Sequence, residues 1–209
     1  MKKTIVVMSA LIIGCATVKA QKISFGVKAG VQQNNLTLKQ KESGEWTRAN
    51  ITGMGFHVGG IADISLNQQF SLQPQLLFNS KSIAMSSMQK INMFAIDIPV
   101  NFLYTHAGFF AGVGPNFSYG ISAKSKMDGS DSQDMYKKYD EGGEDASQLK
   151  RFELGANLTM GYKFGNGVMI STNYAQGLSN ISGYATSNNK FSTRQVGLSI
   201  GYILGSHAK

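Results

Sequence analysis

Apolar residues alternate with small or polar residues at every second position in eight separate segments of this chain. In the clearest segment, 151–164, Phe, Leu, Ala, Met and Tyr alternate with Arg, Glu, Gly, Asn, Thr and Lys. Because successive side chains of a β-strand point to opposite faces, this period of two predicts strands with one apolar face. The predicted strands begin near Ile23, Met54, Phe70, Phe94, Phe109, Phe152, Val168 and Val196. The sequence therefore predicts an all-β fold.

The links between the predicted strands are alternately short and long. We predict tight turns at 67–69, 105–108 and 165–167, and long loops at 34–52, 82–92, 125–150 and 180–190. Short turns at one end and long loops at the other, joining an even number of antiparallel strands, are typical of outer-membrane barrels. We therefore predict an eight-stranded antiparallel transmembrane β-barrel, an up-and-down meander with strands of about 10 to 13 residues and both termini periplasmic.

The first 20 residues have the features of an export signal. Two lysines precede an apolar stretch that ends near Gly14, and Val18-Lys19-Ala20 offers the small residues that signal peptidase reads. The apolar stretch is too short to cross a bilayer as a helix. We predict a signal peptide at 1–20 and one barrel domain at 21–209, because no shift in composition suggests a second domain.

Cys15 is the single cysteine of the chain. Ile12-Ile13-Gly14-Cys15 resembles a lipobox, so a lipoprotein signal, with Cys15 lipidated instead of removed, is the alternative to ordinary cleavage. Either signal takes the protein out of the cytoplasm, and we expect it in the cell outer membrane. One cysteine also excludes a disulfide framework and a cysteine-built metal site.

The period of two does not say which face of the sheet is the inside. A soluble lipocalin-like carrier would line its interior with the apolar face and expose the other face to water. Here that other face is mostly Gly, Ser, Asn, Gln and Thr, in a chain with only 15% charged residues. Such a face suits a narrow polar lumen better than a watery exterior. We therefore favour the membrane barrel and keep a periplasmic carrier of an apolar ligand as the alternative.

Aromatic residues on the apolar face gather beside the short turns. Outer-membrane barrels carry girdles of aromatic side chains where the wall meets the membrane interfaces. We therefore predict a girdle at the periplasmic interface, formed by Phe102, Tyr104, Phe109, Tyr162, Phe164 and Tyr202.

Charged residues also occur on the inward face of the predicted strands. Seven share this parity: Lys28, Asp63, Lys81, Asp97, Arg151, Glu153 and Lys163. The interior of an eight-stranded barrel is just wide enough for side chains to fill it, and charges there must be paired or hydrated. We interpret the seven as a structural polar network that fills the lumen, with Lys28 and Asp97 at middle depth. A small ion-conducting path is the alternative.

The sequence predicts no catalytic site, no cofactor and no metal. A lipid-modifying barrel enzyme would need a nucleophile and a base close together at the outer rim. Of the three histidines only His57 can approach the wall, and its parity points it inward, where a lone histidine usually forms a hydrogen bond. The acidic spacing of the 125–150 loop does not match an EF-hand. We expect a non-enzymatic protein, and a small lipid-modifying enzyme is the least favoured alternative.

Four stretches of the sequence share a further pattern. They are the opening 23–31, the segment 95–104 with its acidic-apolar-proline order Asp97-Ile98-Pro99, the stretch Gly112-Val113-Gly114-Pro115 and the closing 196–202. Together they resemble the PorT-type outer-membrane β-barrel family. The resemblance implies an eight-stranded barrel of the Gram-negative outer membrane. The member that gives the family its name takes part in secretion and maturation of surface proteases, whereas most members have no assigned role.

Location and resemblance together suggest the partners. We expect contact with outer-membrane lipids and lipopolysaccharide, and with the barrel-assembly machinery. Such barrels often end on an aromatic residue, whereas this chain continues for five residues past Leu204, so recognition would rest on Tyr202 and Leu204. Envelope or secretion proteins would bind the loops 34–52 and 125–150, in envelope organisation, adhesion or support of secretion. An exported barrel meets no nucleic acid.

Overall fold

The computed structural model describes residues 22–42, 45–86, 89–127, 133–136, 138–141, 144–147, 149–183 and 189–204. Its long strands are β1 Ile23–Glu42, β2 Glu45–Ser65, β3 Phe70–Ser86, β4 Gln89–His106, β5 Phe109–Met127, β9 Phe152–Lys163, β10 Val168–Gly177 and β11 Asn189–Ile203. Within these ranges the structure contains no helix long and apolar enough to span a membrane. The predicted signal peptide lies outside the described residues.

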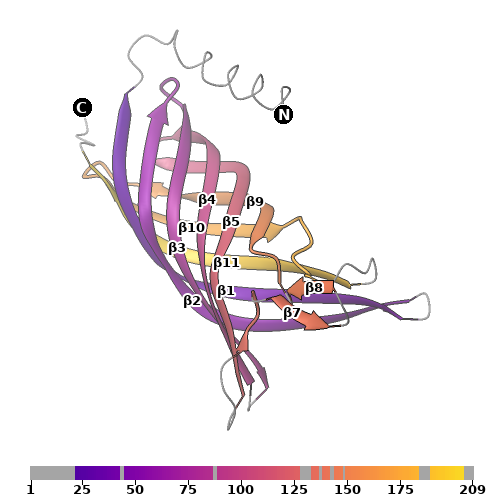
Figure 1. The fold of residues 1–209 in the computed structure, drawn as a ribbon. Coiled ribbons are helices and arrows are strands. Elements are labelled where there is room, and N and C mark those ends of the chain that lie inside the picture. Colours follow the sequence, from indigo (N-terminus) through magenta and orange to yellow (C-terminus); the bar gives the residue numbers. More distant parts are fainter. Residues whose placement is uncertain are drawn as a thin grey trace, which may run out of the picture.

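Each long strand pairs with two others, so the sheet closes on itself. The order is β4-β3-β2-β1-β11-β10-β9-β5, and β4 also pairs with β5. β1 pairs with β11, which brings the first and last strands of the chain side by side. All of these pairings are antiparallel, and Figure 1 shows the strands curving around a common interior. The predicted eight-stranded antiparallel barrel is confirmed.

Three tight turns join strands at one end of the barrel, which we name the turn end. Ala107 and Gly108 have φ angles of 49° and 84°, and a two-residue type I′ turn requires positive φ at both positions. At the other two turns, the Oδ1 atoms of Asn67 and Asn166 accept hydrogen bonds from backbone N–H groups two or three residues ahead. These short side chains complete the turns that the sequence predicts.

The strands are longer than predicted at the opposite end, which we name the hairpin end. The segments 34–52 and 82–92, expected as loops, are mostly paired strand: β1 and β2 stay in register as far as Glu42 and Glu45. The alternation of apolar and polar residues stops where the lipid-facing surface stops. Backbone N–H and C=O groups still pair beyond that level, because they need partners whatever the side chains are. The expectation of long loops at these two places is therefore wrong.

The 125–150 link contains three short strands, β6 Gln133–Asp134, β7 Lys138–Glu141 and β8 Glu144–Ser147. β6 pairs with the end of β5, and β7 and β8 form a separate two-stranded sheet. The backbone N–H of Leu149 donates to the carbonyl of Met135 at 3.1 Å. The segment around β6 and Leu149 is therefore tied to the hairpin end of the barrel.

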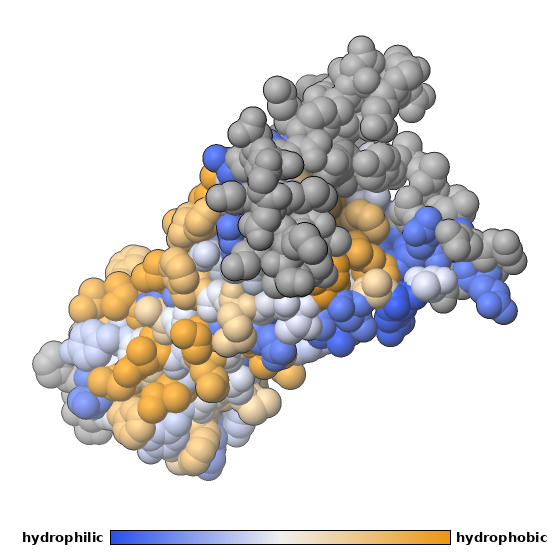
Figure 2. Space-filling view, turned by 90° about the horizontal axis from the view of Figure 1, so that it is seen from below, coloured by the Kyte–Doolittle hydropathy of each residue, from blue (hydrophilic) through white to orange (hydrophobic). Residues whose placement is uncertain are grey.

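The apolar face of the barrel points outward. Most large hydrophobic side chains on the outside are exposed, such as Leu198 at 63%, whereas most of their inward neighbours on each strand are buried. Figure 2 shows hydrophobic residues spread over the barrel wall, and hydrophilic residues gathered at the end toward which the β1–β2 hairpin projects in Figure 1. A lipocalin-like carrier would have the opposite orientation, so this arrangement argues against that alternative.

The apolar outer band ends well below the strand tips. On β1 the outward residues change from Val31 to Gln33, on β4 from Phe94 to Asn92. On β11 the change falls between Val196 and the charged residue Arg194. The strands therefore continue beyond the level at which their outer face is apolar.

Candidate functional site in the barrel lumen

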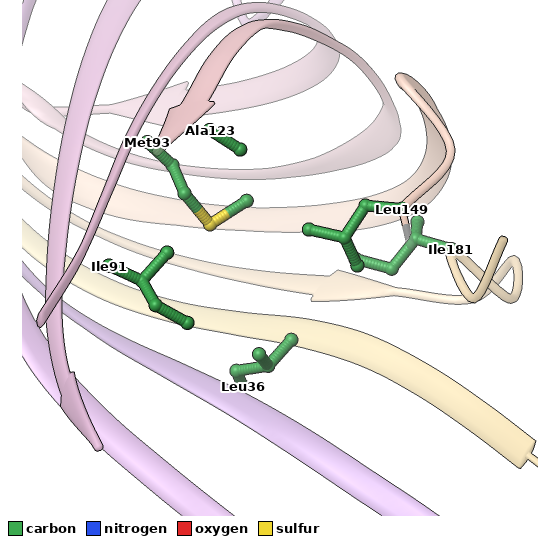
Figure 3. Packing of buried hydrophobic residues seen from close by; sticks show 6 residues of the cluster. All are labelled: Leu36, Ile91, Met93, Ala123, Leu149 and Ile181. Carbon is green, nitrogen blue, oxygen red and sulfur yellow. The ribbon is translucent and has the colours of Figure 1, made fainter. Parts of the chain in front are cut away.

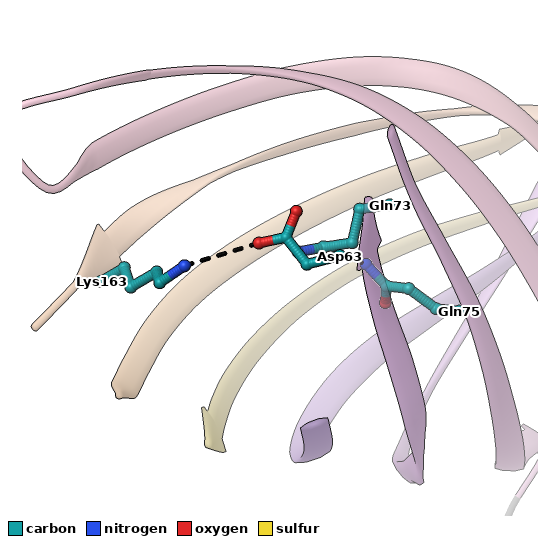
Figure 4. Close-up of polar contacts among 4 residues, drawn as sticks. All are labelled: Asp63, Gln73, Gln75 and Lys163. Atoms are coloured by element: carbon teal, nitrogen blue, oxygen red, sulfur yellow. Dashed lines mark hydrogen bonds and ion pairs between the residues drawn. The ribbon is translucent and has the colours of Figure 1, made fainter. Parts of the chain in front are cut away.

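An ion pair crosses the lumen at the turn end. The Nζ atom of Lys163 on β9 lies 3.5 Å from Oδ2 of Asp63 on β2, two strands on opposite sides of the closed order. Figure 4 shows the two side chains reaching toward each other, with Gln73 and Gln75 of β3 nearby. The lysine side chain is 32% exposed, so water screens the pair, and we expect it to contribute about 1 kcal/mol at most.

A layer of apolar side chains fills the lumen next to this pair. Its members come from five strands and are at most 6% exposed: Ile61, Leu103, Phe110, Met169 and Ile203. The lumen is therefore not polar throughout, contrary to the expectation from the sequence. At this depth apolar side chains fill the narrow interior without any need for hydrogen-bond partners.

The middle of the lumen holds a hydrogen-bond network of mostly neutral side chains. His57 Nδ1 lies 2.8 Å from Gln32 Oε1, and its Nε2 lies 2.8 Å from Ser199 Oγ. Since an amide oxygen can only accept, Nδ1 carries the proton and Nε2 accepts from the serine hydroxyl. Gln195 Nε2 also donates to Gln32 Oε1, and reaches Asn79 Oδ1 at 3.4 Å. Both ring nitrogens of His57 are thus engaged in structural hydrogen bonds.

A glycine makes room for this histidine. A Cβ atom at Gly30 would lie 2.7 Å from both Cε1 and Nε2 of the His57 ring. That separation is shorter than the contact between non-bonded atoms, so only glycine fits beside the imidazole. The small residues on the inward face therefore determine where the larger polar side chains can lie.

Lys28 and Asp97 are both buried in the lumen but use different partners. Lys28 Nζ donates to Gln75 Oε1 at 3.4 Å, and Asp97 Oδ1 accepts from Ser118 Oγ at 2.5 Å. Each side chain is only 4% exposed. Of the seven predicted lumen charges, Lys163 and Asp63 form the one ion pair among themselves. Neutral Gln and Ser side chains, which the sequence did not single out, therefore serve as partners for Lys28 and Asp97.

Glu153 and Lys81 are buried nearer the hairpin end. The Glu153 carboxylate accepts hydrogen bonds from Thr193, through the backbone N at 3.0 Å and Oγ1 at 2.7 Å. Lys81 lies on β3 opposite Met93 of β4, close to a second apolar layer. These two charges thus lie apart from the Lys163–Asp63 pair at the turn end.

Arg151 attaches the long link to the barrel wall. Its Nη1 donates to the carbonyls of Gly120 and Ile121 at 3.0 and 2.8 Å, and its guanidinium lies 4.5 Å above the centre of the Tyr136 ring. A Cβ at Gly120 would lie 1.9 Å from the Tyr136 hydroxyl oxygen, so the glycine lets this ring lie against the strand. Burial raises the pKa of the Tyr136 hydroxyl to about 12, although the Arg151 cation opposes that shift. The hydroxyl therefore stays protonated at neutral pH.

The second apolar layer closes the hairpin end of the lumen. Figure 3 shows its six residues, each at most 7% exposed: Leu36, Ile91, Met93, Ala123, Leu149 and Ile181. Leu149 and Ile181 belong to links between strands, and the amide of Lys150 donates to the carbonyl of Ile181 at 2.8 Å. The links thus fold inward over the mouth of the barrel. The sequence indicates this inward folding only weakly, because Leu149 and Ile181 are each a single apolar residue in a polar segment.

The six predicted girdle residues lie around the outside of the turn end. Tyr162 contacts Phe109 and Phe164, with ring centroids 4.8 and 4.9 Å apart. Phe70 was not among the predicted girdle residues, but its ring centroid lies 5.4 Å from that of Phe102 and 5.3 Å from that of Tyr104. Tyr202 is 43% exposed on the outer wall of β11. Phe70 is the first residue of β3 and lies beside a tight turn. This position in the sequence could have identified it as a girdle residue.

The polar side chains of the described residues bond largely to one another and to the backbone. Among them, no cluster of three or more His, Cys, Asp or Glu side chains is arranged to hold a metal ion. The buried polar atoms instead form hydrogen bonds between strands that lie apart in the sheet, such as Asn157 Nδ2 to Asn101 Oδ1 at 2.8 Å. The lumen is thus built as a filled interior.

Comparison with known protein families supports the same architecture. The family described as outer membrane protein beta-barrel domain matches residues 19–183. The chain belongs to this family. Its barrel is therefore an outer-membrane β-barrel, with the turn end toward the periplasm and the hairpin end toward the outside. A search of curated proteins finds no significant match. The finer PorT-type assignment stays a prediction.

Solved structures show the fold again. Neisserial surface protein A is 11% identical, with 87% of this chain and 99% of that chain covered and a TM-score of 0.54. Ail, the attachment invasion locus protein of Yersinia pestis, is 12% identical, with 84% and 98% covered and a TM-score of 0.37. At such low identity the likeness to the Neisserial protein shows a shared fold alone.

Proposed function

We propose that this protein is a non-enzymatic outer-membrane barrel with a sealed lumen, which acts through its outer hairpins. Its work would be envelope organisation, adhesion or support of protein secretion, the last suggested by the resemblance to the PorT-type family. One contrast carries the proposal: apolar layers close the interior at both ends, while β1 and β2 continue far beyond the lipid-facing band. A filled interior leaves the outer surface as the place for interaction.

The sealed lumen predicts the absence of steady ion conduction. An ion would have to cross two layers of apolar side chains, and losing its hydration there costs several kcal/mol without a paired charge. We expect planar bilayers containing the protein to show no steady current steps above the lipid baseline. Insertion is verified by the faster gel mobility of the unboiled barrel. Large and stable single-channel currents from verified insertions would contradict the sealed lumen.

Action through the hairpins predicts protein contacts at the β1–β2 tip. Gln40 and Thr47 are exposed and lie opposite each other near this tip, whereas Tyr136 of the long link is half-buried against Arg151. A photoreactive residue at position 40 or 47 should therefore crosslink to envelope proteins in living cells. Val27, which is 59% exposed on the lipid-facing wall, is the control position and should yield lipid adducts.

Two results of this crosslinking would count against the proposal. The first is the absence of any protein adduct at either tip position, in cells where the barrel is folded. The second is an identical set of protein adducts from the tip and from position 27, which would indicate random collisions in the membrane.

A further inference from the structure

Strand β2 has an open edge at the hairpin end. Its pairing with β3 begins at Gly53, opposite Ile83, whereas its pairing with β1 continues to Glu45. β3 turns back into β4 after Ser86. Figure 1 shows the consequence, because the β1–β2 hairpin projects to one side, away from the tips of β3 and β4. Within the described part of the chain, residues 46–52 are therefore paired on one side only.

Every second residue of this segment directs its backbone groups to the open side. At the other end of β2, the Ser65 N–H donates to the Lys22 carbonyl, on the β1 side. The Leu66 N–H donates to the Phe70 carbonyl, on the β3 side. The registers of β2 with β1 and β3 run without a shift, so this alternation continues along the strand. The N–H and C=O groups that point to the open edge are therefore those of residues 46, 48, 50 and 52.

The edge of β11 at the same end is covered by the chain itself. Residues 189–193 lie beyond the pairing of β11 with β10, which ends at Arg194. There the Phe191 N–H donates to Asn180 Oδ1 at 2.8 Å, and the Phe191 carbonyl accepts from the Ile181 N–H at 3.0 Å. Among the described residues, none forms such a bond on the open side of β2. An uncovered edge of this kind is a template for pairing with another chain.

The side chains along the open edge indicate what it can accept. Arg48 is exposed on the outward face, and Lys39 lies directly opposite it on β1. On the inward face, Ile51 packs against the second apolar layer. An added strand would continue the pleat, so one of its residues would lie beside Arg48 and one of opposite parity beside Ile51. A carboxylate suits the first position, and an apolar side chain suits the second.

We propose that the open edge of β2 binds an extended, acidic segment of another protein, which joins the sheet as an additional strand. In this mode of recognition backbone hydrogen bonds provide affinity and side chains provide specificity. A second copy of this chain fits less well, because residues 46–52 include no Asp or Glu and would bring another Arg48. The inference rests on the proposed function, since it specifies the contact through which the outer hairpins act.

The first test uses charge to locate the added strand. The probes are two short fluorescein-labelled peptides of alternating Val and Thr, with one central Thr replaced by Glu in one peptide and by Lys in the other. Each is titrated into the protein in phosphatidylcholine nanodiscs. We expect the Glu peptide to bind roughly fivefold more tightly, and Arg48→Glu to reverse the order. Lys124→Glu is the matched control, because both edges of β5 are paired there, and it should leave the order unchanged.

The second test removes one backbone donor from the edge. Asn50→Pro deletes an N–H that points to the open side, while residues 49 and 51 keep their bonds to β1. Asn50→Ala is the control, because it removes the same side chain, which accepts from Thr37 Oγ1 at 3.0 Å, but keeps the N–H. We expect Asn50→Pro to weaken binding of the Glu peptide roughly tenfold, and Asn50→Ala less than about threefold.

Three results would overturn the proposal. They are equal binding to Asn50→Pro and Asn50→Ala, an order of the two peptides that responds equally to Arg48→Glu and Lys124→Glu, and no saturable binding of either peptide to the unmodified protein. Dimers of the unmodified protein that Asn50→Pro dissociates would overturn it in favour of a second copy at this edge.

A change in the peptide replaces Asn50→Pro if that variant does not migrate as a folded barrel. Two Glu peptides are then methylated on alternate sets of backbone amides. Only the set that faces β2 should weaken binding, and equal binding of the two would overturn the proposal. The proposed function is tested separately by crosslinking at the hairpin tip. Protein crosslinks that persist in Asn50→Pro would retain that function and reject the added strand, whereas their absence from every variant would reject both.

Discussion

Replacing Leu198 with arginine should lower the free energy of unfolding in lipid vesicles by about 2–4 kcal/mol. Leu198 is 63% exposed on the outer wall of β11, midway between the girdle residue Tyr202 and the polar level that begins at Arg194. An arginine there must enter hydrocarbon near the middle of the bilayer. The measurement is reversible unfolding by denaturant in vesicles, with Leu198→Met as the control for side-chain shape.

The matched comparison is Leu204→Arg at the turn end of the same wall. Leu204 is also outward, and 55% exposed, but lies beyond Tyr202 at the periplasmic interface. An arginine there reaches headgroups and water, so we expect a loss of about 0–1 kcal/mol. Ser199, the inward neighbour of Leu198, is unsuitable because its hydroxyl bonds to His57 in a filled lumen. Equal losses at 198 and 204 would mean that this wall does not face a bilayer.

The orientation of the wall could be predicted from the sequence because lipid contact imposes a strict period of two. Leu198 and Ser199 illustrate this, since each residue type matches the environment that its parity implies. The three tight turns could be predicted too, because Asn67, Gly108 and Asn166 meet local backbone requirements that act within a few residues. Features that depend on local backbone chemistry or on lipid contact could therefore be predicted from the sequence.

The lengths of the strands and the apolar layers could not be predicted in this way. Leu103 stands between Phe102 and Tyr104, and in such an unbroken apolar run the inward residue cannot be distinguished by its type. Leu149 and Ile181 fill the outer mouth only because two separate links fold over it, which depends on contacts distant in sequence. Beyond the lipid-facing band, strands β1 and β2 continue without any alternation that marks them.

The seven predicted lumen charges show that the parity of a residue along its strand is not sufficient to predict its interaction partner. Parity gives the face of each residue, but the depth of each side chain depends on how the tilted strands are staggered around the closed barrel. Asp63 and Lys163 meet across the lumen although 100 positions separate them in the chain, while Lys28 and Asp97 bond to Gln75 and Ser118 instead. The partner of each lumen charge could therefore be predicted only if the register of all eight strands were known.

The neighbouring residues Phe109 and Phe110 allow a direct test of the apolar layer at the turn end. Phe110 is 6% exposed inside the lumen, and Phe109 is 67% exposed on the outer wall. We expect Phe110→Ala to lower the free energy of unfolding by about 3–5 kcal/mol, because a cavity remains where the ring was. Phe109→Ala should cost only about 1 kcal/mol, chiefly for the lost contact with the Tyr162 ring.

The difference between the two variants comes from what can fill the vacated space. At position 109 a lipid chain replaces the ring, whereas at position 110 Ile61, Leu103, Met169 and Ile203 enclose the space and no lipid reaches it. Unfolding in vesicles measures both costs, and Phe110→Leu should recover most of the loss because it restores much of the volume. A larger cost at 109 than at 110 would place the ring of Phe109 in the interior. Phe110 would then lie on the outer wall and not in the lumen. The inference that an apolar layer seals the periplasmic end would have to be abandoned.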